Sequence, residues 1–176
     1  MAIRRRKIEA LIDELLEEHD MTEAPVSVAE IAEANGARIF YKSLKDDTSG
    51  FLYRDKDHSV IGVNTHHARV RQNFTMAHEL GHLLLHDQEQ LHVDRGGFAL
   101  RLRNDVSKQG TDEYEREANF FAASLLMPRT FIERDLAEEE TVDLLDESFL
   151  NKLAKKYEVS TQALVNRLKN LGYIHE

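Results

Sequence analysis

The residue spacing with the most chemical content is His78-Glu79-Leu80-Gly81-His82, an HExxH motif. In a helix, residues i and i+4 project from the same face about 6 Å apart, so two imidazoles can bind one metal ion. Glu79 directly follows the first histidine and is therefore placed beside the metal, where a carboxylate can accept a proton from water. The motif predicts a metal site with His78 and His82 as ligands and Glu79 as the catalytic base.

The segment around the motif has the character of a helix. Leu80, Leu83 and Leu84 give it an apolar face, and no proline interrupts it. The alternative is an ordinary helix with two exposed histidines that bind nothing.

A catalytic zinc site has three protein ligands and an open position for water. His86 lies eight residues from His78, about 12 Å along a helix axis, so the two side chains cannot reach one ion. We therefore expect His86 to be a partner of a ligand or a surface residue. We interpret His66, His67 and His92 as ordinary loop or helix-end histidines.

The better third ligand lies downstream, in residues 113–128. Glu115 and Asn119 share a helix face at i and i+4, so Glu115 can bind the metal while Asn119 accepts a hydrogen bond from the far nitrogen of a ligand histidine. Glu113 and Glu117 remain alternatives to Glu115, because they lie on neighbouring faces. Small and apolar residues of this helix would let it approach the HExxH helix closely; they are Ala118, Phe121, Ala122 and Leu125.

The elements that must position these residues follow from the hydrophobic pattern. Besides a long central helix from Asn64 or Thr65 to about His86, we expect helices over 3–19, 28–34, 112–126, 129–137, 146–157 and 161–171. Strands are expected over 37–43, 50–54 and 59–63, joined as a small antiparallel meander. Residues 87–111 are expected to be a loop with at most a short strand.

Particular residues are expected to begin or end these helices. Asn64 or Thr65 is expected to cap the central helix, and Ser27 and Ser160 two of the others, since their side chains can accept from backbone N–H groups. Gly172 is expected to end the last helix.

Length and composition bound the class of protein. A chain of 176 residues fits one domain, or one domain with a small appendage, and 41% apolar with 31% charged residues excludes a disordered chain. The formal net charge of −9 argues against a protein that coats nucleic acid. The absence of cysteine excludes thiolate ligands and disulfides. No apolar run approaches the roughly 18 residues of a membrane span, and the basic start leads into a charged segment, so we expect a cytoplasmic protein.

Two blocks, FTMAHELGHLLLH at 74–86 and EREANFFAASLLMP at 115–128, resemble the ImmA/IrrE family of zinc metallo-endopeptidases. The upstream segments SGFLYRD and IGVN are also similar to that family, and the resemblance covers roughly residues 20–130. It implies that His78, His82 and Glu115 bind one Zn²⁺ per chain and that Glu79 is the catalytic base. His₂Glu sites also accept other divalent ions.

The resemblance also implies a substrate class. Many members of that family cut a helix-turn-helix repressor, so the expected partner is a cytosolic transcriptional repressor in phage, mobile-element or stress regulation. The alternative is a non-catalytic regulator that keeps the metal site for structure, or a DNA-binding protein that uses its C-terminal helices.

Together these features predict an α+β fold. Residues 1–140 would form a zincin-like metallopeptidase domain, with a small antiparallel sheet packed on two site-forming helices, and residues 141–176 a helical, helix-turn-helix-like appendage. In the last helix the cations are Arg167 and Lys169, near its C-terminal end, whereas recognition helices read bases near their N-terminal end. Packing or substrate docking is therefore preferred over direct DNA binding through residues 146–171.

Overall fold

The computed structural model describes residues 3–45, 47–56, 58–86, 91–94, 109–138, 143–144 and 146–174, with the side chains of 94 and 109–112 left out. The helices are α1 (Arg5–Glu18), α2 (Val28–Ala34), α3 (Arg69–Leu85), α4 (Gln109–Leu126), α5 (Arg129–Ala137), α6 (Glu147–Lys156) and α7 (Thr161–Leu171). The strands are β1 (Ala37–Lys42), β2 (Gly50–Arg54), β3 (Ser59–Asn64) and β4 (Leu91–Asp94). The predicted α+β class is confirmed.

The sheet differs from the expected meander in its topology. Its strand order is β1-β3-β2-β4, with β1 parallel to β3 and the other two pairs antiparallel. The sheet is therefore mixed, which corrects the prediction of an antiparallel one. β4 lies within the segment that was expected to hold at most a short strand; the neighbouring residues 87–90 and 95–108 of that segment lie outside the described residues.

The side chain of Asn64 explains how β2 reaches the far side of β3. Asn64 is fully buried, its Nδ2 donates to the carbonyls of Lys45 and Thr48, and its Oδ1 accepts from the backbone N–H of Leu44 and of His66. These bonds hold Leu44, Lys45 and Thr48 against the end of β3, and β2 then pairs with the edge of β3 opposite β1.

Asn64 is thus committed to the β3 end and does not cap the central helix as predicted. The N-cap position of α3 is Ala68, four residues later, and it makes no side-chain capping bond. Ser27 does precede α2 but also makes no capping bond. Ser160 and Gly172 behave as expected: Ser160 accepts from the N–H of Ala163, and Gly172 has φ +85°.

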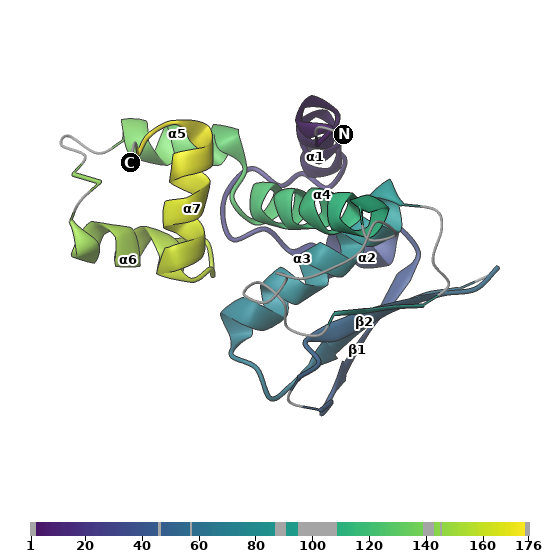
Figure 1. Ribbon diagram of the computed structural model, residues 1–176. Coiled ribbons are helices and arrows are strands. Elements are labelled where there is room, and N and C mark those ends of the chain that lie inside the picture. Colours follow the sequence, from purple (N-terminus) through teal and green to yellow (C-terminus); the bar gives the residue numbers. More distant parts are fainter. Residues whose placement is uncertain are drawn as a thin grey trace.

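Helices cover one face of the sheet, with α3 packed directly on β2 and β3 and α4 packed on the far side of α3 (Figure 1). The close approach of α3 and α4 depends on Gly81, because a Cβ there would lie 3.2 Å from the Ala118 Cα and 3.0 Å from the Phe121 ring. Buried apolar residues of both helices, including Leu80, Ala118 and Leu125, form the centre of the core. This packing brings the two predicted ligand helices side by side.

The N-terminal helix α1 lies across α4 on the side away from the sheet (Figure 1). Its buried face consists of Ile8, Ile12, Leu15 and Leu16, at the spacing of an amphipathic helix. Its first residues therefore come close to the site-forming helices.

The C-terminal helices α5, α6 and α7 gather at one end of the molecule (Figure 1). The Tyr157 hydroxyl donates to Asp135 over 2.8 Å, and the Nε of buried Arg167 donates to the Met127 carbonyl. Their buried side chains, such as Leu164 and Leu168, belong to the same hydrophobic core as those of α1 and α4. The boundary near residue 140 stays a prediction.

Candidate metal centre

Helix α3 presents His78 and His82 on one face, as the i, i+4 spacing predicts. Both side chains are buried, and their Nε2 atoms lie 3.1 Å apart. The rings meet edge to face, with 4.7 Å between centroids. The two nitrogens that would bind a metal therefore converge on one point.

Glu115 reaches the same point from α4. Its Oε2 lies 3.7 Å from His78 Nε2, and its Oε1 lies 3.6 Å from His82 Nε2. Ligands bound at about 2.0–2.1 Å in a tetrahedral zinc site are about 3.3 Å apart, close to the three separations found here. The donor set of two imidazoles and one carboxylate thus fits zinc in type and spacing.

Asn119 lies one turn beyond Glu115 on α4, with its Oδ1 3.1 Å from His78 Nδ1. An amide oxygen there can accept the N–H of a histidine whose other nitrogen binds metal. The residue is placed where the helix spacing predicts, and its role stays a prediction.

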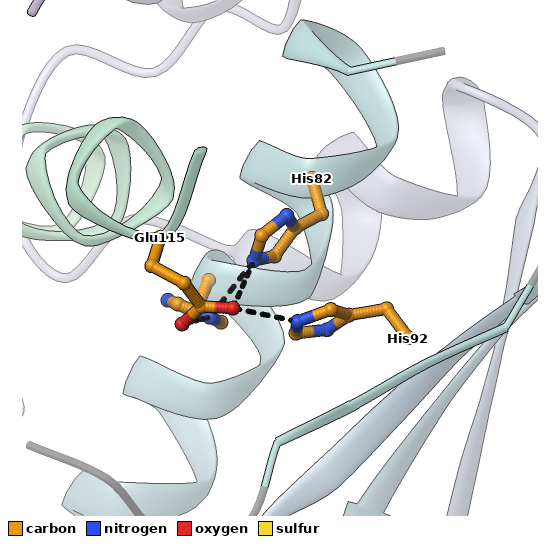
Figure 2. A group of neighbouring side chains, drawn as sticks. His82, His92 and Glu115 are labelled. Carbon is orange, nitrogen blue, oxygen red and sulfur yellow. Dashed lines mark hydrogen bonds and ion pairs between the residues drawn. The ribbon is translucent and has the colours of Figure 1, made fainter. Parts of the chain in front are cut away.

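His92 reaches the candidate metal centre, a placement that sequence reasoning missed. It lies on β4 opposite Leu52, and its Nδ1 lies 3.0 Å from Glu79 Oε2. Its Nε2 lies 2.8 Å from Glu115 Oε1 (Figure 2). The interpretation of His92 as an ordinary loop or helix-end histidine is therefore wrong. Alternation along Leu91-His92-Val93, which turns two exposed apolar side chains away and the histidine inward, is the signal that could have found it.

His92 joins the group of residues that could hold an ion. Candidate ligand atoms of His78, His82, His92 and Glu115 all lie within 4.8 Å of one another. His66 and His67 do not belong to this group and lie in the loop before α3, as interpreted from the sequence.

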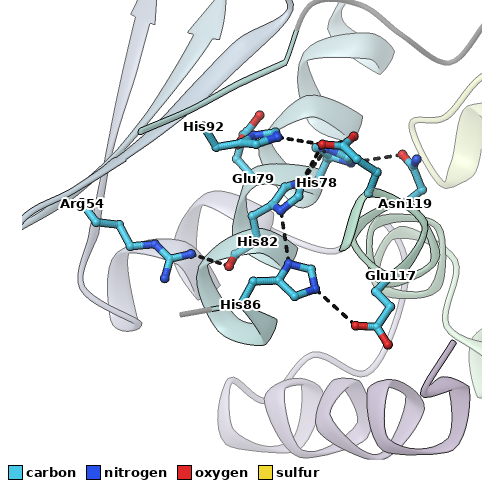
Figure 3. A network of polar contacts seen from close by, with 9 residues as sticks. Arg54, His78, Glu79, His82, His86, His92, Glu117 and Asn119 are labelled. Carbon is cyan, nitrogen blue, oxygen red and sulfur yellow. Dashed lines mark hydrogen bonds and ion pairs between the residues drawn. The ribbon is translucent and has the colours of Figure 1, made fainter. Parts of the chain in front are cut away.

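Glu79 is not one of these four residues but lies beside them, in contact with His92, and is fully buried. Its contact with His92 holds the carboxylate beside the histidine pair (Figure 3). A base that acts on water at a metal site needs this position.

Glu117 and His86 lie on the other side of His82. The His86 ring is buried, with Nδ1 3.2 Å from His82 Nδ1 and Nε2 3.2 Å from Glu117 Oε2. Glu117, one of the alternatives to Glu115, is bound by Arg4 and faces His86 rather than the predicted ligands. His86 is thus a partner of His82, one of the two readings that its spacing left open.

The pKa values of His82 and His92 are shifted in opposite directions by their surroundings. Burial lowers the pKa of His82, and the neighbouring His78 and His92 lower it further, which favours the neutral form that binds metal. Burial also disfavours the charged form of His92, but hydrogen bonds to Glu115 and Glu79 outweigh it and raise its pKa to about 10. The Arg4 guanidinium is the main cause that lowers the pKa of Glu117 to about 2.

The sequence matches a known protein family over most of its length. Residues 32–169 match the peptidase family described as the IrrE N-terminal-like domain. Over 140 residues, covering 77% of this chain and 78% of the relative, the sequence is 28% identical to "Uncharacterized immunity region protein 2" of Bacillus phage phi105.

The fold is similar to that of a solved structure, a Mycobacterium tuberculosis transcriptional regulator, with a TM-score of 0.62 and 15% sequence identity. The likeness covers 93% of this chain but 46% of the regulator, so the chain spans about half of that protein's length. At this identity the comparison concerns the fold alone.

Proposed function

The chain belongs to the IrrE N-terminal-like family of peptidases, and from this premise we propose that it is a zinc-dependent endopeptidase that cleaves a regulatory protein. The observation that carries the proposal is the convergence of His78, His82 and Glu115 around one point with the buried carboxylate of Glu79 beside it. A purely structural metal site has no use for a carboxylate base at that position.

His78, His82 and Glu115 would hold the ion. Zinc held by such a set would supply a Lewis acid that polarises the scissile carbonyl and makes water a nucleophile at neutral pH. Glu79 takes a proton from the attacking water and then transfers it to the nitrogen of the leaving amine. One side chain thus acts first as base and then as acid.

His92 supports this chemistry from the strand side. Its Nδ1 contact with Glu79 orients the carboxylate that acts as base, and its Nε2 contact with Glu115 holds that side chain toward the predicted ligands. We assign it as a donor rather than a resident ligand, because both of its nitrogens face carboxylates.

A transcriptional repressor is the substrate class that we propose. The relative from Bacillus phage phi105 is named for the immunity region of the phage, and immunity rests on the control of phage genes. An endopeptidase in that setting would act by cutting the protein that keeps those genes silent.

A second candidate is a non-catalytic regulator with a closed metal site. The proximity of His92 to Glu115 favours it, because four protein ligands are typical of structural zinc. The same protein would then use the site for folding or for binding a partner.

Substitution Glu79→Gln tests the proposed function. Gln has nearly the shape of Glu and cannot accept a proton, so the variant should keep zinc and fold but cleave about 10²–10⁴-fold more slowly. Zinc-loaded wild type and variant would be incubated with small repressors encoded near this gene, and products followed on gels and by mass spectrometry.

Glu113→Gln is the control, since it makes the same change at a glutamate of α4 outside the metal-facing group and should cleave like wild type. A Glu79→Gln protein that cleaves as fast as wild type would refute the mechanism. Zinc binding by a wild type that cleaves none of the repressors would favour the non-catalytic regulator.

A further inference from the structure

A buried polar chain leads from the metal-facing pair to the start of the N-terminal helix. It runs from His82 through His86 to Glu117 (Figure 3). From Glu117 it continues to Arg4, and each step is within hydrogen-bond distance. His86 and Glu117 are 6% and 1% exposed, whereas the Arg4 side chain is about half exposed, at 47%. None of these three contacts is needed to bind a metal ion directly.

Donor and acceptor are fixed in the hydrogen bonds between Arg4 and Glu117, because an arginine side chain can only donate. Arg4 Nη2 lies 2.6 Å from Glu117 Oε2, Arg4 Nε lies 2.9 Å from Oε1, and the Arg4 backbone N–H also donates to Oε1. This bidentate pair holds both carboxylate oxygens as acceptors. A second bond, from Arg4 Nη2 to the Leu85 carbonyl, ties the guanidinium to the end of α3.

The acceptor role of Glu117 determines which ring nitrogens of His86 and His82 carry a proton. Since Glu117 accepts, His86 must carry its proton on Nε2, and a neutral His86 then has its lone pair on Nδ1. His86 Nδ1 can therefore accept only from His82 Nδ1–H. The lone pair of His82 is left on Nε2, the atom that faces His78 and Glu115.

His78, the other predicted ligand histidine, also has an acceptor at Nδ1, so its lone pair is likewise left on Nε2. His78 Nδ1 faces the Asn119 amide oxygen, which accepts without further support. At His82 the acceptor is itself a histidine, with two tautomers, so it needs a third group to select one. Glu117 makes that selection, and Arg4 holds Glu117.

We propose that His86, Glu117 and Arg4 are positioning residues that fix the ring and tautomer of His82, so that the N-terminal segment sets the metal affinity of the site. The proposal rests on the metal-binding part of the proposed function and is independent of cleavage. Partners of metal ligands typically contribute about 10–100-fold to metal affinity.

Zinc affinity of matched variants, measured by chelator competition, tests the proposal. Phe at position 86 keeps a ring that can stack on Tyr114, whose centroid lies 4.3 Å from that of His86, but it has no acceptor. Gln can both accept from His82 and donate to Glu117. His86→Phe should weaken zinc binding at least about tenfold, and His86→Gln should restore most of it.

The outer residue has its own matched pair. Arg4→Ala should weaken zinc binding several-fold, because Glu117 then lacks the cation that orients it. Arg6→Ala removes an exposed arginine of α1 outside the chain of contacts and should leave affinity unchanged. Equal affinities for wild type, His86→Phe and Arg4→Ala would overturn the proposal, as would equal losses in His86→Phe and His86→Gln.

Tautomers of the wild-type protein give a readout that does not depend on variants folding. Long-range ¹H–¹⁵N spectra of the zinc-loaded, ¹⁵N-histidine-labelled protein should show His86 protonated on Nε2 alone. A proton on Nδ1 of His86 would overturn the proposal, because that nitrogen could not accept from His82. A wild type with this tautomer and no cleavage activity would support the positioning role of His86, Glu117 and Arg4 and contradict the proposed protease function. A wild type that cleaves but has the other tautomer would contradict the positioning role and support the protease function.

Discussion

Glu115 and Glu117 lie two positions apart on α4 but contact different histidines. Glu115 faces the Nε2 atoms of His78 and His82, whereas Glu117 is held between Arg4 and His86. Helical spacing alone left both open as ligands, because each can reach a neighbouring face. Only the packing of α1 and α3 on α4 separates their roles.

Glu115→Gln is expected to weaken zinc binding more than Glu113→Gln, by at least about tenfold, because only the first change removes a metal-facing carboxylate. Chelator titration of the two purified variants measures the difference. Equal affinities would show that α4 supplies its ligand from another position.

His92 separates the two candidate functions at the residue scale. As a donor that orients Glu79, it should affect catalysis more than metal binding. We expect His92→Ala to retain zinc with an affinity within a few-fold of wild type and to lose at least about tenfold in kcat. A loss of zinc affinity as large as that of His78→Ala would instead make His92 a fourth ligand.

The residues of the site differ in how far sequence could predict them. The HExxH motif is local, so His78, Glu79 and His82 follow from one helix. His92 lies on a strand paired with β2, and its side chain points inward only because of the register between them. That register depends on residues distant in sequence, which explains the wrong interpretation.

At the scale of elements, the contact between α3 and α4 determines the site. Gly81 lies in the middle of the HExxH motif and also at the closest approach of the two helices. A larger side chain would push α4, and Glu115 with it, away from the histidine pair.

Gly81→Val should therefore lower the free energy of unfolding by about 1–3 kcal/mol and weaken zinc binding. Gly81→Ala should have a smaller effect, since its single Cβ meets the neighbours at 3.0–3.3 Å and the helix gains propensity of about 1 kcal/mol. Denaturant unfolding and chelator titration of both variants provide the test. Unchanged zinc affinity in Gly81→Val would mean that the helices tolerate separation.

Helices were predicted more closely than the sheet for a physical reason. The residues of α2 and α5 carry their own periodicity and stop signals, so the expected 28–34 and 129–137 agree with the structure. Strand order depends on which partners a strand finds. β1 pairs with β3 in parallel, and buried bonds of Asn64 hold the segment that follows β1; no local pattern reveals either.

At the scale of the whole molecule, the contacts of α6 and α7 indicate whether these helices can bind DNA. Arg167, one of the two cations of α7, is 2% exposed and hydrogen-bonded to the Met127 carbonyl, so it cannot reach a DNA groove. Glu158, at the turn between α6 and α7, accepts from Asn73 of α3. The helix pair thus contacts α3 and α4, and the preference for packing or substrate docking over DNA binding stays a prediction. No helix in the described part of the chain has the length and apolar character to cross a bilayer.

We therefore expect no specific binding of DNA. Fluorescence anisotropy of a labelled duplex should show weak retention that disappears between about 50 and 200 mM salt, as for contacts with phosphate alone. A tight complex that survives the higher salt would reassign residues 146–171 to DNA recognition.

The placing of the proposed ligands on two core helices has a consequence for the life of the protein in a cell. An ion that binds only the folded chain stabilises it, by about 2.7 kcal/mol at a free concentration of 100 times Kd, a large share of the 5–15 kcal/mol typical of a domain. A chain that lacks zinc would therefore unfold more often and be degraded sooner by cellular proteases. Zinc supply would then control how much of the protein exists, in addition to whether each copy is active.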